Sequence, residues 1–218
     1  MTQLMLQKCF KPILLTVLSA VFLIGASPQP RRVLFLGDSI TAGYGLEPEQ
    51  AYPALIQQKI DANGLKFRVI NAGQNGDTSA GGLNRLEWLM KSPVDVLVLE
   101  LGGNDGLRGL PVSVTRKNLQ AIVDRTKARY PKVEIIIAGM KVPPNMGRDY
   151  ERQFENIFTD LAAKNRLVLI PFVLEGVGGV RSLNFPDGVH PTAKGHTIVA
   201  AHVWKFLRPV LEKISKTP

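Results

Sequence analysis

The sequence predicts an α/β fold, in which a five-stranded parallel sheet forms the middle layer of a three-layer α/β/α sandwich. Short runs of branched apolar residues alternate with helical patterns along the chain after residue 32. Polar, glycine-rich segments follow several of these runs directly. That placement is expected at the carboxyl ends of parallel strands, where open α/β sheets bind their ligands.

Five apolar runs predict the strands. Each run is continuously apolar rather than alternating, which indicates a strand buried on both faces. The runs are Val33 to Leu36, Phe67 to Ile70, Val94 to Leu99, Val133 to Ala138, and Leu167 to Ile170.

Five helical patterns separate or follow these runs, each with apolar residues on one face. Asn63-Gly64 ends the first helix, and Pro209 is expected to kink the last. The apolar faces carry Tyr52, Leu55, Ile56 and Ile60; Leu83, Leu86 and Met90; Leu119, Ile122, Val123 and Thr126; Tyr150, Phe154, Ile157, Phe158 and Leu161; and Val199, Val203, Phe206, Val210 and Ile214.

The first 26 residues have the pattern of a secretory signal peptide. Lys8 and Lys11 precede an uncharged apolar run, Ile13 to Ile24, and small residues follow up to Ser27. The run is shorter than the roughly 20 residues that a membrane-spanning helix needs. We expect cleavage after Ala26, export to the periplasm or the medium, and one domain over residues 27–218. An uncleaved anchor is the alternative.

Composition narrows the class of protein further. The chain has 218 residues, 45% of them hydrophobic, with a net charge of +9 and a single cysteine, Cys9, within the leader. The domain therefore has no cysteine for disulfides or thiol chemistry. The basic residues are scattered without a nucleic-acid-binding motif, so we expect no nucleic-acid partner. The positive charge would attract the protein weakly to anionic membrane surfaces or acidic substrates; the alternative, which we favour, is that it serves solubility alone. We also expect a monomer.

Ser39 is the candidate nucleophile. It follows the first predicted strand in Gly37-Asp38-Ser39, a strand-to-helix turn that leaves its own N–H pointing outward. A serine hydroxyl needs a neighbouring base to become a nucleophile, so this serine alone is a weak signal. The Gly-x-Ser-x-Gly elbow of the α/β-hydrolases is missing, which argues against that fold.

His190 is the candidate base and Asp187 its orienting carboxylate. They lie three residues apart in Asp187-Gly188-Val189-His190, a spacing that lets the carboxylate reach the near imidazole nitrogen. An Asp-Gly turn before a helix is also common without any catalytic role. His196 and His202 fall within the last helical pattern and are assigned to packing or to the surface.

Two turns offer hydrogen-bond donors for an oxyanion. Gly76 lies in the turn after the second strand, where the absence of a side chain lets a substrate oxygen approach its N–H. Asn104 lies in Gly102-Gly103-Asn104-Asp105-Gly106 after the third strand. With the Ser39 N–H, these groups would make a three-donor oxyanion hole.

These blocks together resemble the SGNH (GDSL-type) hydrolases, closest to the bacterial thioesterase I, lysophospholipase L1 and arylesterase group. Four blocks occur in the family's order: Gly37 to Ile40, Asn75 to Asp77, Gly103 to Asp105, and Asp187 to Pro191. The strings LFLGDSITAGYGL, NGDTSAGG and ELGGNDGLRG extend the likeness, which covers nearly all of the chain from Arg32 onward.

The resemblance implies a flavodoxin-like SGNH fold, a Ser39–His190–Asp187 triad, and an oxyanion hole of Ser39, Gly76 and Asn104. It also implies no metal and no cofactor. Ile40 replaces the family's leucine, a volume-conserving change. We interpret the acids Asp38, Asp77 and Asp105 as turn and network residues.

We therefore expect a serine esterase that acts on small-molecule or lipid esters: acyl thioesters, lysophospholipids or aryl esters. The loops over residues 142–148 and 176–185 are expected to shape the acyl groove. Three alternatives stay open: a carbohydrate O-deacetylase on the same scaffold, a noncatalytic flavodoxin-like binding module, and a noncatalytic surface protein held by the N-terminal segment.

Overall fold

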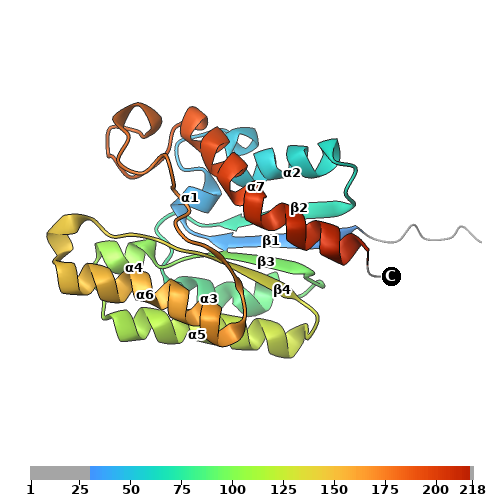
Figure 1. Ribbon diagram of the computed structural model, residues 1–218, viewed down its shortest axis with the longest axis horizontal. Helices are drawn as coiled ribbons and strands as arrows, with labels where there is room; N and C mark the ends of the chain where they lie inside the picture. The colour runs from blue at the N-terminus through green and yellow to red at the C-terminus, as the bar shows by residue number, and fades with distance from the viewer. Residues whose placement is uncertain (1–29, 217–218) are drawn as a thin grey trace, which may run out of the picture.

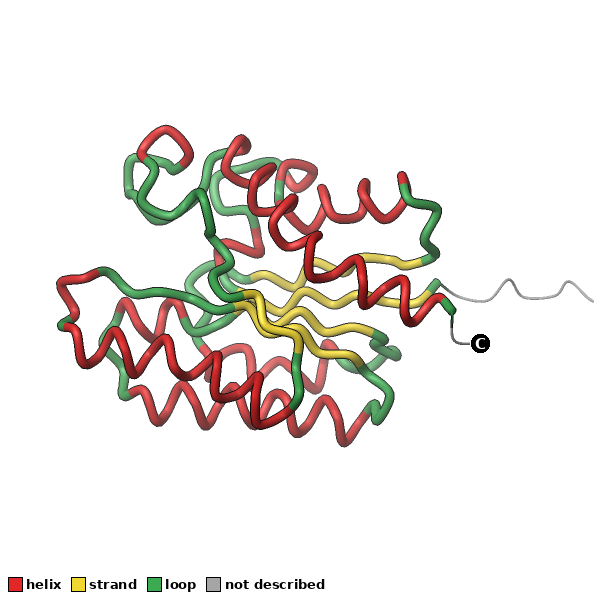
Figure 2. Tube along the Cα trace, viewed as in Figure 1, coloured by secondary structure: helices red, strands yellow, loops and turns green. Residues whose placement is uncertain are grey.

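The computed structural model describes residues 30–216, and these form one α/β/α sandwich (Figure 1). The expected leader over residues 1–26 lies outside the described residues. Five parallel strands make the central layer, and helices cover both of its faces (Figure 2). Within residues 30–216, no helix is both long and apolar enough to cross a membrane.

The five predicted strands are confirmed, with small changes at their ends. They are β1 (Arg31–Gly37), β2 (Phe67–Gly73), β3 (Val96–Glu100), β4 (Glu134–Ala138) and β5 (Val168–Ile170). In β1 and β3, every residue from Val33 to Gly37 and from Val96 to Glu100 is buried. Helices on both faces exclude water from these strands, which explains their unbroken apolar runs.

The strand order is β2-β1-β3-β4-β5, and every pair is parallel. The chain leaves β1 toward one edge of the sheet to form β2, then returns to the other side of β1 to form β3. The loops after β1 and β3 therefore diverge at their carboxyl ends. This switch point is where such sheets place their ligands.

The five predicted helices are confirmed, and two short helices join them. On one face lie α2 (Tyr52–Ala62) and α7 (Ala193–Ser215), and on the other lie α3 (Ser79–Leu89), α5 (Val112–Arg129) and α6 (Arg148–Asn165) (Figure 1). The short helices are α1 (Ser39–Ala42), after β1, and α4 (Gly103–Leu107), after β3. The last helix continues through Pro209.

The start of β1 and the end of α7 lie together at the edge of the sheet opposite the switch point (Figure 1). The Arg31 guanidinium donates a hydrogen bond to the Ile214 carbonyl there. This hydrogen bond joins the two segments at the amino ends of the strands, while the loops that carry the candidate site residues lie at the carboxyl ends.

Candidate active site

The structure brings Ser39 and His190 into direct contact, although 151 positions separate them. Nε2 of His190 lies 2.9 Å from Oγ of Ser39. Ser39 is the first residue of α1 and is buried, whereas His190 lies in the loop before α7 with its side chain 20% exposed. The predicted nucleophile and base therefore meet at the carboxyl edge of the sheet.

Asp187 completes the contact chain from the outer side of the imidazole. Its Oδ2 lies 2.8 Å from Nδ1 of His190, and its Oδ1 accepts the backbone N–H groups of Val189 and His190 at 2.8 and 3.0 Å. These hydrogen bonds, led by the His190 N–H, lower the pKa of Asp187 to about 2. A charged Asp187 favours a proton on Nδ1, which leaves Nε2 free to accept from the Ser39 hydroxyl.

Asp38 fixes the turn that presents Ser39. Its Oδ1 accepts the N–H of Ile40 at 3.0 Å and so caps α1, while Gly43 ends the helix in the left-handed conformation with φ of 80°. Burial raises the pKa of Asp38 to about 6. The Ser39 N–H lies in the first turn of α1, where backbone amides have no intrahelical acceptor.

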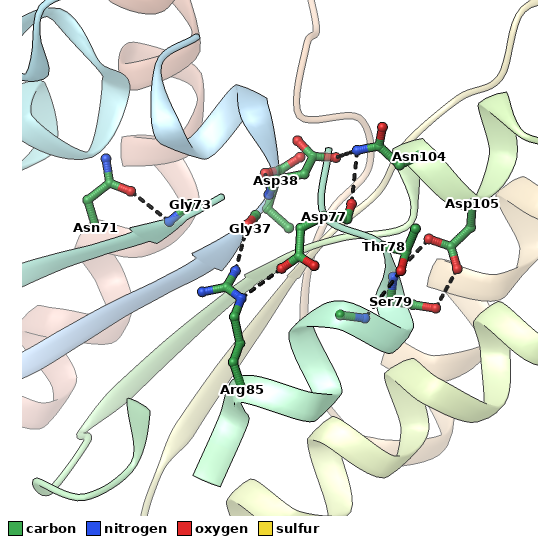
Figure 3. Close-up of polar contacts among 12 residues, drawn as sticks. Gly37, Asp38, Asn71, Gly73, Asp77, Thr78, Ser79, Arg85, Asn104 and Asp105 are labelled. Atoms are coloured by element: carbon green, nitrogen blue, oxygen red, sulfur yellow. Dashed lines mark hydrogen bonds and ion pairs between the residues drawn. The ribbon is translucent and has the colours of Figure 1, made fainter. Parts of the chain in front are cut away.

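Asn104 lies across the site from α1, on α4. Its side-chain amide donates to the carbonyl of Asp77 at 2.9 Å and to Oδ2 of Asp38 at 3.3 Å (Figure 3). It thereby links the loops after β1, β2 and β3. The longer bond, to Asp38, is the weaker of the two.

Gly76 lies in the turn after β2 with φ of 74°, a conformation that favours glycine. A Cβ atom built there would have only the Arg108 guanidinium within 4 Å, at 3.8 Å, so this side of the turn is open. Arg108 holds the turn by donating to the Gly76 carbonyl at 3.0 Å. The turn therefore has room beside residue 76, where the sequence predicts that a substrate oxygen approaches.

The acids Asp77 and Asp105 are network residues, as interpreted from the sequence. Asp77 pairs with Arg85 at 2.7 Å, and Arg85 also donates to the Gly37 carbonyl at 3.0 Å (Figure 3). Asp105 accepts from the N–H and hydroxyl of Ser79. The described residues contain no group of three or more His, Cys, Asp or Glu that could surround a metal ion.

Glu100 is a buried acid that sequence reasoning missed. It ends β3 beneath the nucleophile turn, where its Oε2 accepts from Thr41 at 2.6 Å and from the Asp38 N–H at 3.3 Å. Its Oε1 is buried with no hydrogen-bond partner among the described residues. Burial, followed by the nearby Asp38 charge, raises the pKa of Glu100 well above its usual value. A glutamate closing an otherwise apolar strand, VLVLE, is the signal that could have identified it.

Tyr44 was also missed. Its ring centroid lies 4.3 Å from that of His190, with 33° between the ring planes.

The assignment of His196 to packing is confirmed. The residue is buried, and its Nδ1 accepts the Tyr52 N–H at 3.0 Å. Burial lowers the pKa of His196 to about 4, which keeps it neutral at ordinary pH.

Comparison with known proteins identifies the family of this chain. The profile of the GDSL-like Lipase/Acylhydrolase family matches residues 35–198. Esterase TesA of Pseudomonas aeruginosa is 38% identical over 202 residues, covering 92% of this chain and 100% of that protein. Thioesterase 1/protease 1/lysophospholipase L1 of Escherichia coli is 38% identical, covering 82% of this chain and 84% of that one.

A solved structure shows the same architecture. The psychrotrophic esterase EstA from Pseudoalteromonas, inhibited by monoethylphosphonate, superposes with a TM-score of 0.79 at 32% identity. The match covers 84% of this chain and 99% of that one. The likeness therefore extends over the whole sandwich and is not confined to the motifs.

Proposed function

Because this chain belongs to the GDSL-like lipase/acylhydrolase family and is therefore a hydrolase of ester bonds, we propose that it works through an acyl-Ser39 intermediate. His190 removes the proton from Ser39, whose Oγ attacks the ester or thioester carbonyl. His190 then protonates the leaving group, and a water activated by the same imidazole releases the acid. The observation that carries this proposal is the 2.9 Å contact between Nε2 of His190 and Oγ of Ser39.

We assign oxyanion stabilisation to the N–H groups of Ser39 and Gly76 and to the Asn104 amide. The three donors come from the loops after β1, β2 and β3, and the hydrogen bonds of Asn104 to Asp38 and Asp77 link these loops. Donors fixed in advance need no reorganisation when charge develops on the substrate oxygen. Asn104 would exchange its 3.3 Å bond to Asp38 for the oxyanion while keeping the bond to Asp77.

For the substrate, we propose esters or thioesters with an apolar acyl or aryl group. Exposed large hydrophobic side chains gather on segments at the carboxyl edge, where the reaction would occur. Leu107 ends α4, three residues after Asn104, and Val180 lies in the predicted groove loop over 176–185. Five of the six such side chains in the described residues lie at this edge: Tyr44, Leu107, Val114, Val180 and Val189.

We further propose that the protein is exported and acts as a monomer, with weak attraction to anionic membranes. The motivation is the charge and apolar pattern before Ser27 and the net charge of +9, which becomes +7 once cleavage removes Lys8 and Lys11. The mass of the protein recovered from a periplasmic extract, set against the full-length mass, tests both export and cleavage.

The direct test of the reaction uses Ser39→Ala beside the wild-type domain. We expect no turnover of p-nitrophenyl esters by the variant, no labelling by a fluorophosphonate probe, and an unchanged melting temperature. An ester series of increasing acyl length, with acyl thioesters, a lysophospholipid and acetylated sugars, locates the substrate class. Hydrolysis by Ser39→Ala at near wild-type rate would refute the nucleophile, and a preference for acetylated sugars would establish the deacetylase alternative.

A further inference from the structure

The loop that carries His190 makes few hydrogen bonds to the rest of the described residues. Residues 184–190 form their hydrogen bonds within the segment 177–192, among the described residues. The one exception is the contact of His190 with Ser39. Asn184, for example, donates to the carbonyls of Val177 and Val180 at 2.7 and 2.9 Å. This base loop is therefore well braced internally, but its position over Ser39 depends on other contacts.

Two of those contacts come from the turn just after α1. The Tyr44 ring lies against the imidazole of His190, with centroids 4.3 Å apart. A Cβ atom built on the neighbouring Gly45 would lie 3.1 Å from the Phe185 ring, so that ring packs on the Gly45 backbone. Phe185 is in turn joined to His190 through its N–H, which donates to the His190 carbonyl at 2.8 Å.

The remaining sides of the imidazole are already occupied. Asp187 faces Nδ1 and Ser39 faces Nε2. Two further titratable groups interact electrostatically with His190: the buried Asp38, on the nucleophile turn, and His196, on α7. Among the described residues, Tyr44 is the one aromatic side chain whose ring pairs with the imidazole, and an aromatic face attracts a cation.

We propose that Tyr44 is a positioning residue for the reaction, whose ring holds His190 over Ser39 and stabilises the imidazolium formed when the base takes the proton. This proposal rests on the function proposed above. The ring, not the hydroxyl, does the work: the Tyr44 hydroxyl has no hydrogen bond to another described residue, and the side chain is 46% exposed. Phenylalanine should therefore replace tyrosine, whereas an aliphatic side chain should not.

The experiment compares Tyr44→Phe, Tyr44→Leu and Tyr44→Ala on a soluble p-nitrophenyl ester, with kcat and KM measured separately across pH. Trp88→Ala is the matched control, because Trp88 is 67% exposed on α3 and contacts none of these residues. Melting temperatures verify that each variant is folded. The rate of fluorophosphonate labelling reports how often His190 and Ser39 are aligned, independently of product release.

We expect Tyr44→Phe to keep kcat within about twofold, and Tyr44→Leu and Tyr44→Ala to lose more than that, up to about thirtyfold, since cation–π interactions range from weak at exposed sites to strong at desolvated ones. In the last two variants the acid limb of the pH–kcat profile should move to lower pH, because the imidazolium is less stabilised. A Tyr44→Leu variant equal to Tyr44→Phe in kcat and in its acid limb would overturn the proposal. Ser39→Ala decides the proposed function separately, since an active Ser39→Ala variant would refute the mechanism whatever the Tyr44 series shows.

Discussion

Oε2 of Glu100 lies 2.6 Å from Oγ1 of Thr41, in a part of the protein that solvent does not reach. The Thr41 hydroxyl lies 2.8 Å from that of Tyr52, so a buried polar chain runs from β3 under α1 to α2. Its acid has a raised pKa and one oxygen without a partner among the described residues. These features indicate a neutral carboxyl group that supports the nucleophile turn from below.

A neutral Glu100 predicts that Glu100→Gln becomes more stable than wild type as the pH rises. The pKa of Glu100 in the folded protein lies above the value of about 4.3 for an unfolded chain. Below about pH 4.3 the neutral carboxyl therefore contributes its full stabilisation of the fold, and this stabilisation is lost as the pH rises through the folded pKa. Glutamine does not titrate. Between the two pKa values, the gap in unfolding free energy should widen by about 1.4 kcal/mol per pH unit.

Urea unfolding of both proteins from pH 4.5 to 8.5 measures this gap. Glu87→Gln, a change at an exposed glutamate on α3, is the control and should show no such trend. A gap that stays constant with pH for Glu100→Gln would mean that the buried carboxyl is already charged.

Replacing Asp187 by asparagine should lower kcat by about 10²- to 10⁴-fold. Oδ1 already accepts two backbone N–H groups, so the asparagine oxygen keeps that place and its NH₂ group faces Nδ1 of His190. The neutral imidazole then carries its proton on Nε2, so this nitrogen can no longer accept a hydrogen bond from Ser39. Asp187→Ala, where water can enter at a side chain 41% exposed, should be no slower than Asp187→Asn. Steady-state rates of the two variants settle the order, and a faster Asp187→Asn would contradict the tautomer argument.

Asn104→Ala should lower kcat by about 10²- to 10³-fold with little change in KM, because the donor acts on charge that develops only in the transition state. Asn118→Ala is a suitable control, since that amide donates to Ser79 at 3.0 Å, away from the reacting atoms. An Asn104→Ala variant that changes KM alone would assign this amide to ground-state binding.

Arg85→Leu should destabilise the fold by about 3 kcal/mol, because it leaves the nearly buried Asp77 carboxylate without its partner. The chain offers a matched comparison in Arg116→Leu. Its pair with Asp160 has the same 2.7 Å separation, but the two side chains are 37% and 58% exposed, so its loss should cost about 0–1 kcal/mol. Equal losses in urea unfolding would show that burial does not govern the Asp77 pair.

The strands and longer helices could be predicted because their signals are local. An unbroken apolar run such as Val96 to Leu99, or the periodic face of α6, reflects its own burial. The short helices α1 and α4 escaped prediction as helices, since four or five residues rich in glycine and polar groups also describe turns. Their positions were nevertheless expected from the strands that they follow.

The predicted site residues were accessible to sequence reasoning because each lies just after a strand or just before a helix. Tyr44 carries no comparable signal, because its contact with His190 exists only after two distant loops have folded together. Glu100 was visible as an acid at the end of β3, but its burial depends on α1 and α2 covering it. Contacts between loops far apart in sequence are what pattern and spacing leave out.

The meeting of β1 and α7 at Arg31 and Ile214 makes this scaffold suited to attachment. A resin, a carrier protein or a surface tether joined near either residue would lie at the amino ends of the strands. The carboxyl ends, where Ser39 and His190 meet, would stay exposed to solution. The same closeness invites circular permutation, in which a short linker joins these two ends and new ends open in an exposed turn such as Asn63-Gly64.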